Sequence, residues 1–145
     1  MNHLNNPNIG ALILRVALAA VLLSHSLYLK LFVFTLPGTA QFFSSIGLPG
    51  WLAYGVFIAE AVGGIAILLG LYTRQCALLM IPILLGATWA HLPNGWLFSN
   101  ANGGWEYPLF LTFISASLAC YGAGEYAIKP DHQHKVRTTP LVAAG

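Results

Sequence analysis

The stretch from Trp51 to Arg74 constrains the fold of this chain more than any other, because nearly all of its residues are apolar or small: WLAYGVFIAEAVGGIAILLGLYTR. About twenty such residues in a helix are enough to cross the hydrocarbon core of a bilayer. One carboxylate, Glu60, lies near the middle of the stretch. A charge at that depth is costly in lipid, so Glu60 must face other protein, water or a ligand.

The composition places the whole chain in the same class. Of 145 residues, 57% are hydrophobic and only 7% are charged, whereas a soluble domain carries about 25% charged residues. We therefore expect an integral membrane protein whose surroundings are the lipid bilayer. The formal net charge of +2 gives no indication of a nucleic-acid partner.

The predicted fold is an all-α membrane protein, a bundle of four transmembrane helices. A short lead, 1–8, precedes a membrane domain, 9–124, and a tail, 125–145, that we expect to be cytoplasmic and partly disordered. Arg15 lies inside the first apolar run, which favours a retained helix over a cleaved signal peptide. Pro82 predicts a kink in the third span without a break. The spans are expected at about 9–34, 51–72, 75–92 and 105–121, with a short interfacial helix within 39–47.

The basic residues predict the orientation of these spans. With four spans, Arg74, Lys129, Lys135 and Arg137 all lie on one side, and the two opposite connections contain no Lys or Arg. The positive-inside rule then places both termini in the cytoplasm. Arg15 is nearest to that face, and we expect it to reach the phosphates of the inner leaflet.

Each predicted span brings an ionisable group to the outer half of the bundle. Glu60 lies roughly 14 Å from the outer end of its span at 1.5 Å per residue. His25 and Lys30 lie in the outer half of the first span, His91 ends the third span, and Glu106 begins the fourth. This one-sided distribution predicts a polar site in the outer half.

These residues also have purely structural interpretations. Lys30 can extend to the outer headgroups, and His91 and Glu106 can be solvated or cap helices. Glu60 can form a buried ion pair, for which His25 is the first candidate partner and Lys30 the second.

The tryptophans gather at the same side of the predicted bundle. Trp51, Trp89, Trp96 and Trp105 all map to the outer interface, which is typical of an anchoring belt. Trp89 and Trp105 are the two that we also consider as ligand-binding residues.

The sequence gives little support for thiol or metal chemistry. The two cysteines, Cys76 and Cys120, form no CxxC and map to the cytoplasmic face, so we interpret them as small core residues. No haem pair, flavin motif, Fe–S cysteine set or metal-ligand spacing is visible.

The segments EAVGGIAILLGLYTR at 60–74, HLPNGW at 91–96 and GGWEY at 103–107 resemble the second helix, third loop and fourth-helix start of the DoxX family of small bacterial membrane proteins. The resemblance covers about residues 10–128. Glu60, His91 and Glu106 fall on the matching motif positions, whereas the first helix has Leu27 where the family tends to have glycine. The resemblance implies a four-helix, multi-pass protein of the cytoplasmic (inner) membrane and a link to quinone-reducing oxidoreductase systems.

The function we expect is that of an oxidoreductase-associated membrane subunit that binds a quinone or a similar lipophilic molecule in the outer half. Glu60 and His91 are the expected catalytic proton-exchanging groups. A soluble or membrane redox partner would supply electrons, and a homo-oligomer is a further expected partner. The alternatives are a non-catalytic binding or transport protein for a small solute and a membrane assembly factor. The expected ligand-binding residues are His25, Lys30, Glu106, Trp89 and Trp105.

Overall fold

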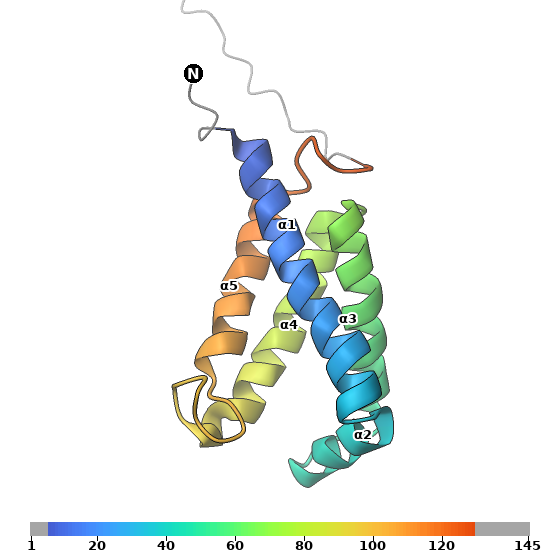
Figure 1. The fold of residues 1–145 in the computed structure, drawn as a ribbon, viewed down its shortest axis with the longest axis vertical. Helices are drawn as coiled ribbons and strands as arrows, with labels where there is room; N and C mark the ends of the chain where they lie inside the picture. The colour runs from blue at the N-terminus through green and yellow to red at the C-terminus, as the bar shows by residue number, and fades with distance from the viewer. Residues whose placement is uncertain (1–5, 130–145) are drawn as a thin grey trace, which may run out of the picture.

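The computed structural model describes residues 6–129, and these contain helices and no β-strand (Figure 1). The all-α prediction is therefore confirmed for this part of the chain, and the predicted interfacial helix is present as α2. The predicted lead and tail lie largely outside the described residues. The elements are α1 (Pro7–Leu23), η2 (Ser24–Val33), α2 (Leu36–Ser45), α3 (Leu52–Leu69), α4 (Thr73–His91), η3 (Leu92–Asn94) and α5 (Glu106–Tyr121).

Three helical stretches are long and apolar enough to cross a membrane: Pro7–Val33, Leu52–Leu69 and Thr73–Asn94. α4 continues through Pro82 without a break. The fourth predicted span is present as α5, whose 16 residues extend about 24 Å. That is shorter than the roughly 30 Å of a hydrocarbon core, so length and composition support three spanning helices directly.

The helices pack around one apolar core. α1 lies against α3 and α5, and α4 lies against the same two helices. Gly64 allows α1 and α3 to approach closely, because a Cβ atom there would lie 3.0 Å from the side chain of Leu23. The core consists mainly of Leu18, Leu22, Ile67, Met80, Leu84 and Leu118.

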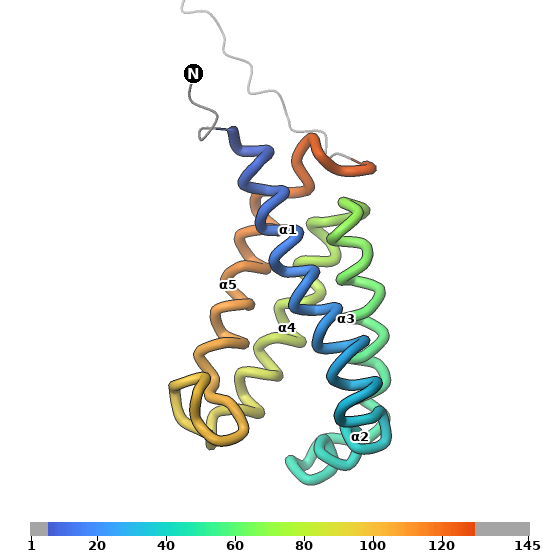
Figure 2. The backbone as a smooth tube through the Cα atoms, viewed as in Figure 1, coloured from blue at the N-terminus to red at the C-terminus, as the bar shows by residue number. Residues whose placement is uncertain are grey.

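The two ends of the bundle differ. The terminal end contains the start of α1, the turn between α3 and α4, and residues 122–129; the loop end contains α2 and residues 92–105 (Figure 2). Towards the loop end, η2 packs against α3 and α2, whereas α5 packs against α4 and α1. The first helical stretch and α5 therefore diverge at the loop end, as the tube in Figure 2 shows.

Arg15, at the terminal end, is buried inside the bundle and does not extend to the lipid. Its side chain is only 2% exposed and donates to the carbonyl oxygens of Ile67 and Leu68 at 2.9 and 2.6 Å. It also donates to Ala123 and Tyr126 at 3.0 and 2.8 Å. The prediction that Arg15 reaches lipid phosphates is wrong, because carbonyls in the last turn of α3 and in the chain after α5 bind all of its guanidinium nitrogens.

The first helical stretch changes its winding at Ser24. From Ser24 to Val33 it is a π-helix, and beyond it Phe34 N donates to Leu29 O, five residues back, at 2.7 Å. π-helical segments are rare and occur frequently at functional sites. The same segment contains His25 and Lys30, two of the residues selected from the sequence.

The cysteines lie towards the terminal end. Cys76 is half-buried, but Cys120 is exposed on the surface of the bundle. The interpretation of Cys120 as a core residue is therefore wrong.

Candidate functional site

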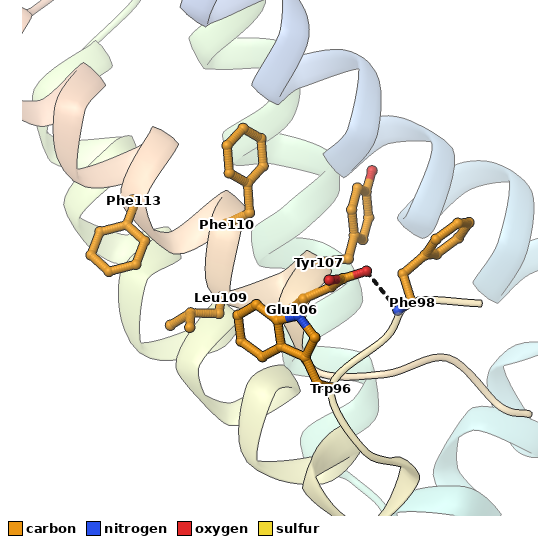
Figure 3. Close-up of a pocket in the computed structure, with 7 residues that line it drawn as sticks. All are labelled: Trp96, Phe98, Glu106, Tyr107, Leu109, Phe110 and Phe113. Atoms are coloured by element: carbon orange, nitrogen blue, oxygen red, sulfur yellow. Dashed lines mark hydrogen bonds between the residues drawn. The ribbon is translucent and has the colours of Figure 1, made fainter. Parts of the chain in front are cut away.

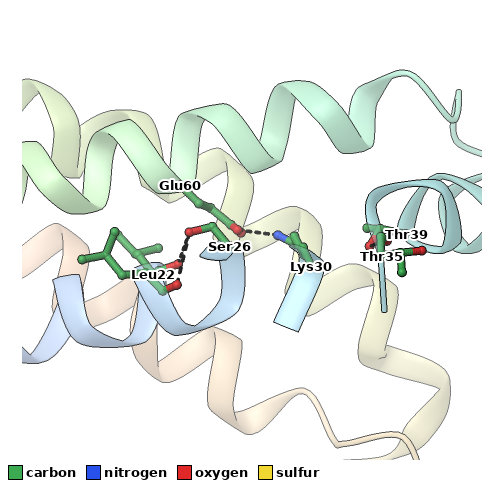
Figure 4. A network of polar contacts seen from close by, with 7 residues as sticks. Leu22, Ser26, Lys30, Thr35, Thr39 and Glu60 are labelled. Atoms are coloured by element: carbon green, nitrogen blue, oxygen red, sulfur yellow. Dashed lines mark hydrogen bonds and ion pairs between the residues drawn. The ribbon is translucent and has the colours of Figure 1, made fainter. Parts of the chain in front are cut away.

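A buried ion pair connects η2 and α3 on the side of the bundle nearest α2. Lys30 Nζ donates to Glu60 Oε2, and the two side chains are 15% and 9% exposed (Figure 4). The sequence predicted that Glu60 needs a buried partner, but it ranked His25 first, and that ranking is wrong. Lys30 therefore points inward to Glu60, and the interpretation that it extends to the headgroups is wrong.

The pair keeps hydrogen-bonding capacity that the described residues do not use. An ammonium group has three donors and a carboxylate has two oxygens, and the contact between Lys30 and Glu60 Oε2 uses one of each. The hydroxyl of Ser26, which lies beside the pair in Figure 4, donates to Leu22 O at 2.8 Å. The pair can consequently donate to, or accept from, a bound molecule without losing its mutual contact.

His91 is fixed by the loop that follows α4. Its Nδ1 lies 3.0 Å from Gly103 O, and Asn94 Nδ2 donates to the same carbonyl at 2.9 Å. A carbonyl oxygen only accepts, so the contact with Gly103 O places a proton on Nδ1. Nε2 is the nitrogen of His91 that remains available for proton exchange.

Glu106 also holds this loop in place. Its Oε1 accepts from the backbone N–H of Phe98 at 2.7 Å, and as the first residue of α5 it lies where a negative charge stabilises the helix dipole. One carboxylate oxygen of Glu106 therefore stabilises the loop that precedes α5. The Glu106 side chain also lines the larger of two neighbouring pockets.

The smaller pocket lies between the first helical stretch and α5 and has a volume of about 310 Å³. His25 and Tyr107 face each other across it, with ring centroids 6.3 Å apart and an interplanar angle of 28°. The pocket is lined by Ala20, Val21, Ser24, His25, Tyr28, Leu29 and Tyr107.

The larger pocket has a volume of about 450 Å³ and follows the outer face of α5 (Figure 3). Tyr107 lines it too, so the two pockets adjoin at that ring. Its other lining residues are Trp96, Phe98, Glu106, Leu109, Phe110 and Phe113.

Of the predicted site residues, His25 lines the smaller pocket and Glu106 the larger one, whereas Glu60, Lys30, His91, Trp89 and Trp105 line neither. Trp105 packs edge-on against Trp96 with ring centroids 4.4 Å apart, and Trp89 lies half exposed on α4. Neither lines the two pockets described above. Within residues 6–129, no three His, Cys, Asp or Glu side chains lie close enough to hold a metal ion.

The sequence reasoning did not select Tyr107, Phe110 or Phe113. A signal was present, because the helix that begins at Glu106 places residues 106, 109, 110 and 113 on one face. The interpretation of the outer aromatic residues as an anchoring belt considered only the four tryptophans, so this face of the fourth predicted span was not examined.

Comparison with known proteins identifies the family. Residues 10–92 match the DoxX family. The chain belongs to the DoxX family. It is also 35% identical over 122 residues to a protein of Bacillus subtilis (strain 168) named "Putative oxidoreductase CatD", which covers 84% of this chain and 86% of the relative. No solved structure gives a significant match. Family membership and the apolar helices together show that the protein is a membrane protein.

Proposed function

We propose that this DoxX protein is an oxidoreductase-associated membrane subunit that binds a quinone or a similar lipophilic molecule at its loop end. The observation that carries the proposal is the buried Lys30–Glu60 pair, whose remaining donors and acceptor have no partner within residues 6–129. An intramembrane ionisable residue is a functional-site candidate by default. The description of the Bacillus relative as an oxidoreductase supports the redox association.

The chemistry assigned to the site is proton exchange. Reduction of a quinone to a quinol consumes two electrons and two protons. Glu60 and His91 Nε2 would exchange the protons with bulk water. His25, which lines the smaller pocket, would donate a hydrogen bond to a ring oxygen, and Lys30 would hold the Glu60 carboxylate beside that pocket. The electrons would come from a partner redox protein, because the sequence contains no haem, flavin or Fe–S motif of its own.

The same proposal includes the membrane placement. The protein would be a multi-pass protein of the cytoplasmic (inner) membrane, with α5 as the fourth span and both termini in the cytoplasm. The absence of Lys and Arg from the connections 34–50 and 92–105 supports this orientation. α5 packs along α4 over its length, which supports its inclusion in the membrane bundle.

The test separates a ligand-binding pair from one that only fixes helix register. Glu60→Gln leaves Lys30 buried and unpaired, which typically costs about 3–5 kcal/mol. The double variant Lys30→Gln/Glu60→Gln restores a neutral hydrogen-bonded pair, and we expect it to recover most of the lost thermal stability in detergent. Quinone co-purifying with the protein, measured by mass spectrometry, should remain low in both variants.

The matched control is Glu125→Gln, which removes a carboxylate from an exposed residue at the terminal end and should change neither measurement. If the double variant recovers stability and also retains wild-type amounts of quinone, the pair serves helix register alone. If no quinone accompanies the wild-type protein, and none binds when it is added, the proposal is refuted.

A further inference from the structure

The larger pocket is an apolar groove that runs along α5. Apart from the carboxylate of Glu106 and the hydroxyl of Tyr107, its lining consists of apolar side chains and the indole of Trp96. Leu109, Phe110 and Phe113 form the deeper part, and the two phenylalanines are 59% and 63% exposed. In Figure 3 their rings flank α5 without covering one another, which leaves the groove open to the side.

The groove continues into the smaller pocket. Phe98, Tyr107 and His25 form a row of rings, with centroid separations of 6.2 and 6.3 Å. Tyr107 lines both pockets. A molecule whose head lies beside His25 can therefore extend past Tyr107 into the groove without crossing a helix.

Within the groove the polar groups precede the apolar ones along α5: Glu106 and Tyr107 lie at its start, and Leu109, Phe110 and Phe113 follow. His25, Ser24 and Tyr28 supply polar groups to the smaller pocket. From Tyr107 the groove extends to Phe113, about 9 Å further along α5 in the direction away from the loop end. An amphiphile in a bilayer keeps its polar head near the interface and its tail towards the hydrocarbon core, which is the same order.

We propose that this groove binds the hydrocarbon tail, of prenyl or similar type, of the ligand whose ring occupies the smaller pocket. This inference rests on the proposed function and adds that the protein selects tailed over tailless quinones. Lipid tails are as apolar as the groove, so side-chain packing, and not transfer from water, supplies the selectivity.

The test compares probes that share one ring. The full chain is reconstituted in phospholipid nanodiscs, and the binding of a substituted 1,4-benzoquinone is measured for the ring alone and for the same ring with a decyl or a prenyl chain. Affinities are expressed per mole of lipid, so that partition into the bilayer is removed from the comparison. We expect the tailed probes to bind on the order of tenfold more tightly than the ring alone.

The groove variant is Phe110→Ala/Phe113→Ala. It should remove this preference while the binding of the ring alone changes less than twofold. The matched control is Phe32→Ala, because Phe32 is 73% exposed on η2 and lines neither pocket. Circular dichroism and melting temperature verify that the variants are folded.

Each outcome separates the tail groove from the proposed function. Equal affinity of tailed and tailless probes for the wild type overturns the tail groove but preserves ring binding. The proposal is also overturned if Phe110→Ala/Phe113→Ala still binds the tailed probes more tightly than the ring alone. If a phospholipid co-purifies with the wild type but not with Phe110→Ala/Phe113→Ala, the groove binds a structural lipid. That result also overturns the proposal that the groove binds the quinone tail. Failure of every probe to bind the wild type refutes the proposed function itself.

Discussion

Replacing Arg15 should destabilise the protein more than replacing any exposed cation, although Arg15 is not part of the candidate site. Its guanidinium group makes hydrogen bonds of 2.6–3.0 Å to the carbonyl oxygens of Ile67, Leu68, Ala123 and Tyr126. Arg15→Met keeps much of the side-chain volume but removes every donor. Each buried carbonyl left without a partner costs about 1–3 kcal/mol.

The size of the effect follows from how many carbonyls water can reach after the substitution. The carbonyl of Ile67 keeps the backbone N–H of Gly70 as a donor at 3.1 Å. If water satisfies one of the other three carbonyls, the remaining two cost about 2–6 kcal/mol together. For a chain of this length, each kcal/mol lowers the melting temperature by about 2–4 °C. We therefore expect Arg15→Met to melt at least about 4 °C below the wild type. Arg15→Lys keeps the charge but has three donors and no planar guanidinium group. Its melting temperature should lie between those of the wild type and Arg15→Met.

The assay is thermal unfolding in detergent, followed by the rate at which the half-buried thiol of Cys76 reacts with a maleimide. The control is Lys129→Met, which removes the same charge from an exposed residue at the same end, where Lys129 lies 4.5 Å from the ring of Tyr72. A cation–π contact at an exposed site contributes about 0.5–1 kcal/mol. A melting temperature for Arg15→Met within 1 °C of the Lys129→Met value would refute the reasoning.

Two further predictions concern topology and helix packing. Reporter fusions after Lys129 and within residues 94–104 should report cytoplasmic and external positions respectively, because the basic residues lie on one side; matching reports from both sites would contradict a four-span topology. Gly64→Val should lower the melting temperature, because a Cβ at Gly64 would lie 3.0 Å from Leu23 and 3.3 Å from Leu22, whereas a Cβ at Gly55 in the same helix meets nothing within 4 Å. Gly55→Val is therefore the control, and equal losses for both variants would show that close approach of α1 and α3 does not limit the stability.

The sequence predicted where Glu60 lies better than it predicted what Glu60 contacts. A carboxylate in an apolar run of this length has to be buried, and Glu60 is 7% exposed. The ranking of His25 before Lys30 rested mainly on the depth of His25 in the first span and on Leu27, which stands where the family tends to have glycine. In the structure the span becomes π-helical at Ser24, and Leu22, Ser26 and Lys30 follow one another at four-residue spacing along the face that meets α3. His25 then faces Tyr107, and no local sequence pattern announces that change of winding.

Arg15 shows a second limit of the sequence reasoning. Positive charge near a membrane face usually reaches lipid phosphates, and this expectation was applied to Arg15. Its carbonyl partners come from residues 67, 68, 123 and 126. Such long-range backbone contacts depend on how the chain folds back after α5, and the side-chain pattern alone does not encode them.

The two buried cations of the first helical stretch show why one end of the bundle is structural and the other is a candidate for chemistry. Arg15 has every guanidinium nitrogen in a hydrogen bond with backbone carbonyls, so a ligand would have to displace bonds that hold three segments together. Lys30 has a single carboxylate partner and lies where η2 and α5 diverge. A buried charge with unused donors is costly in the absence of a further partner. A molecule with acceptor oxygens can accept hydrogen bonds from the unused donors of Lys30. These hydrogen bonds would stabilise the ammonium group and thereby favour binding of the molecule. The loop end is therefore where we expect ligand binding and proton exchange to be coupled.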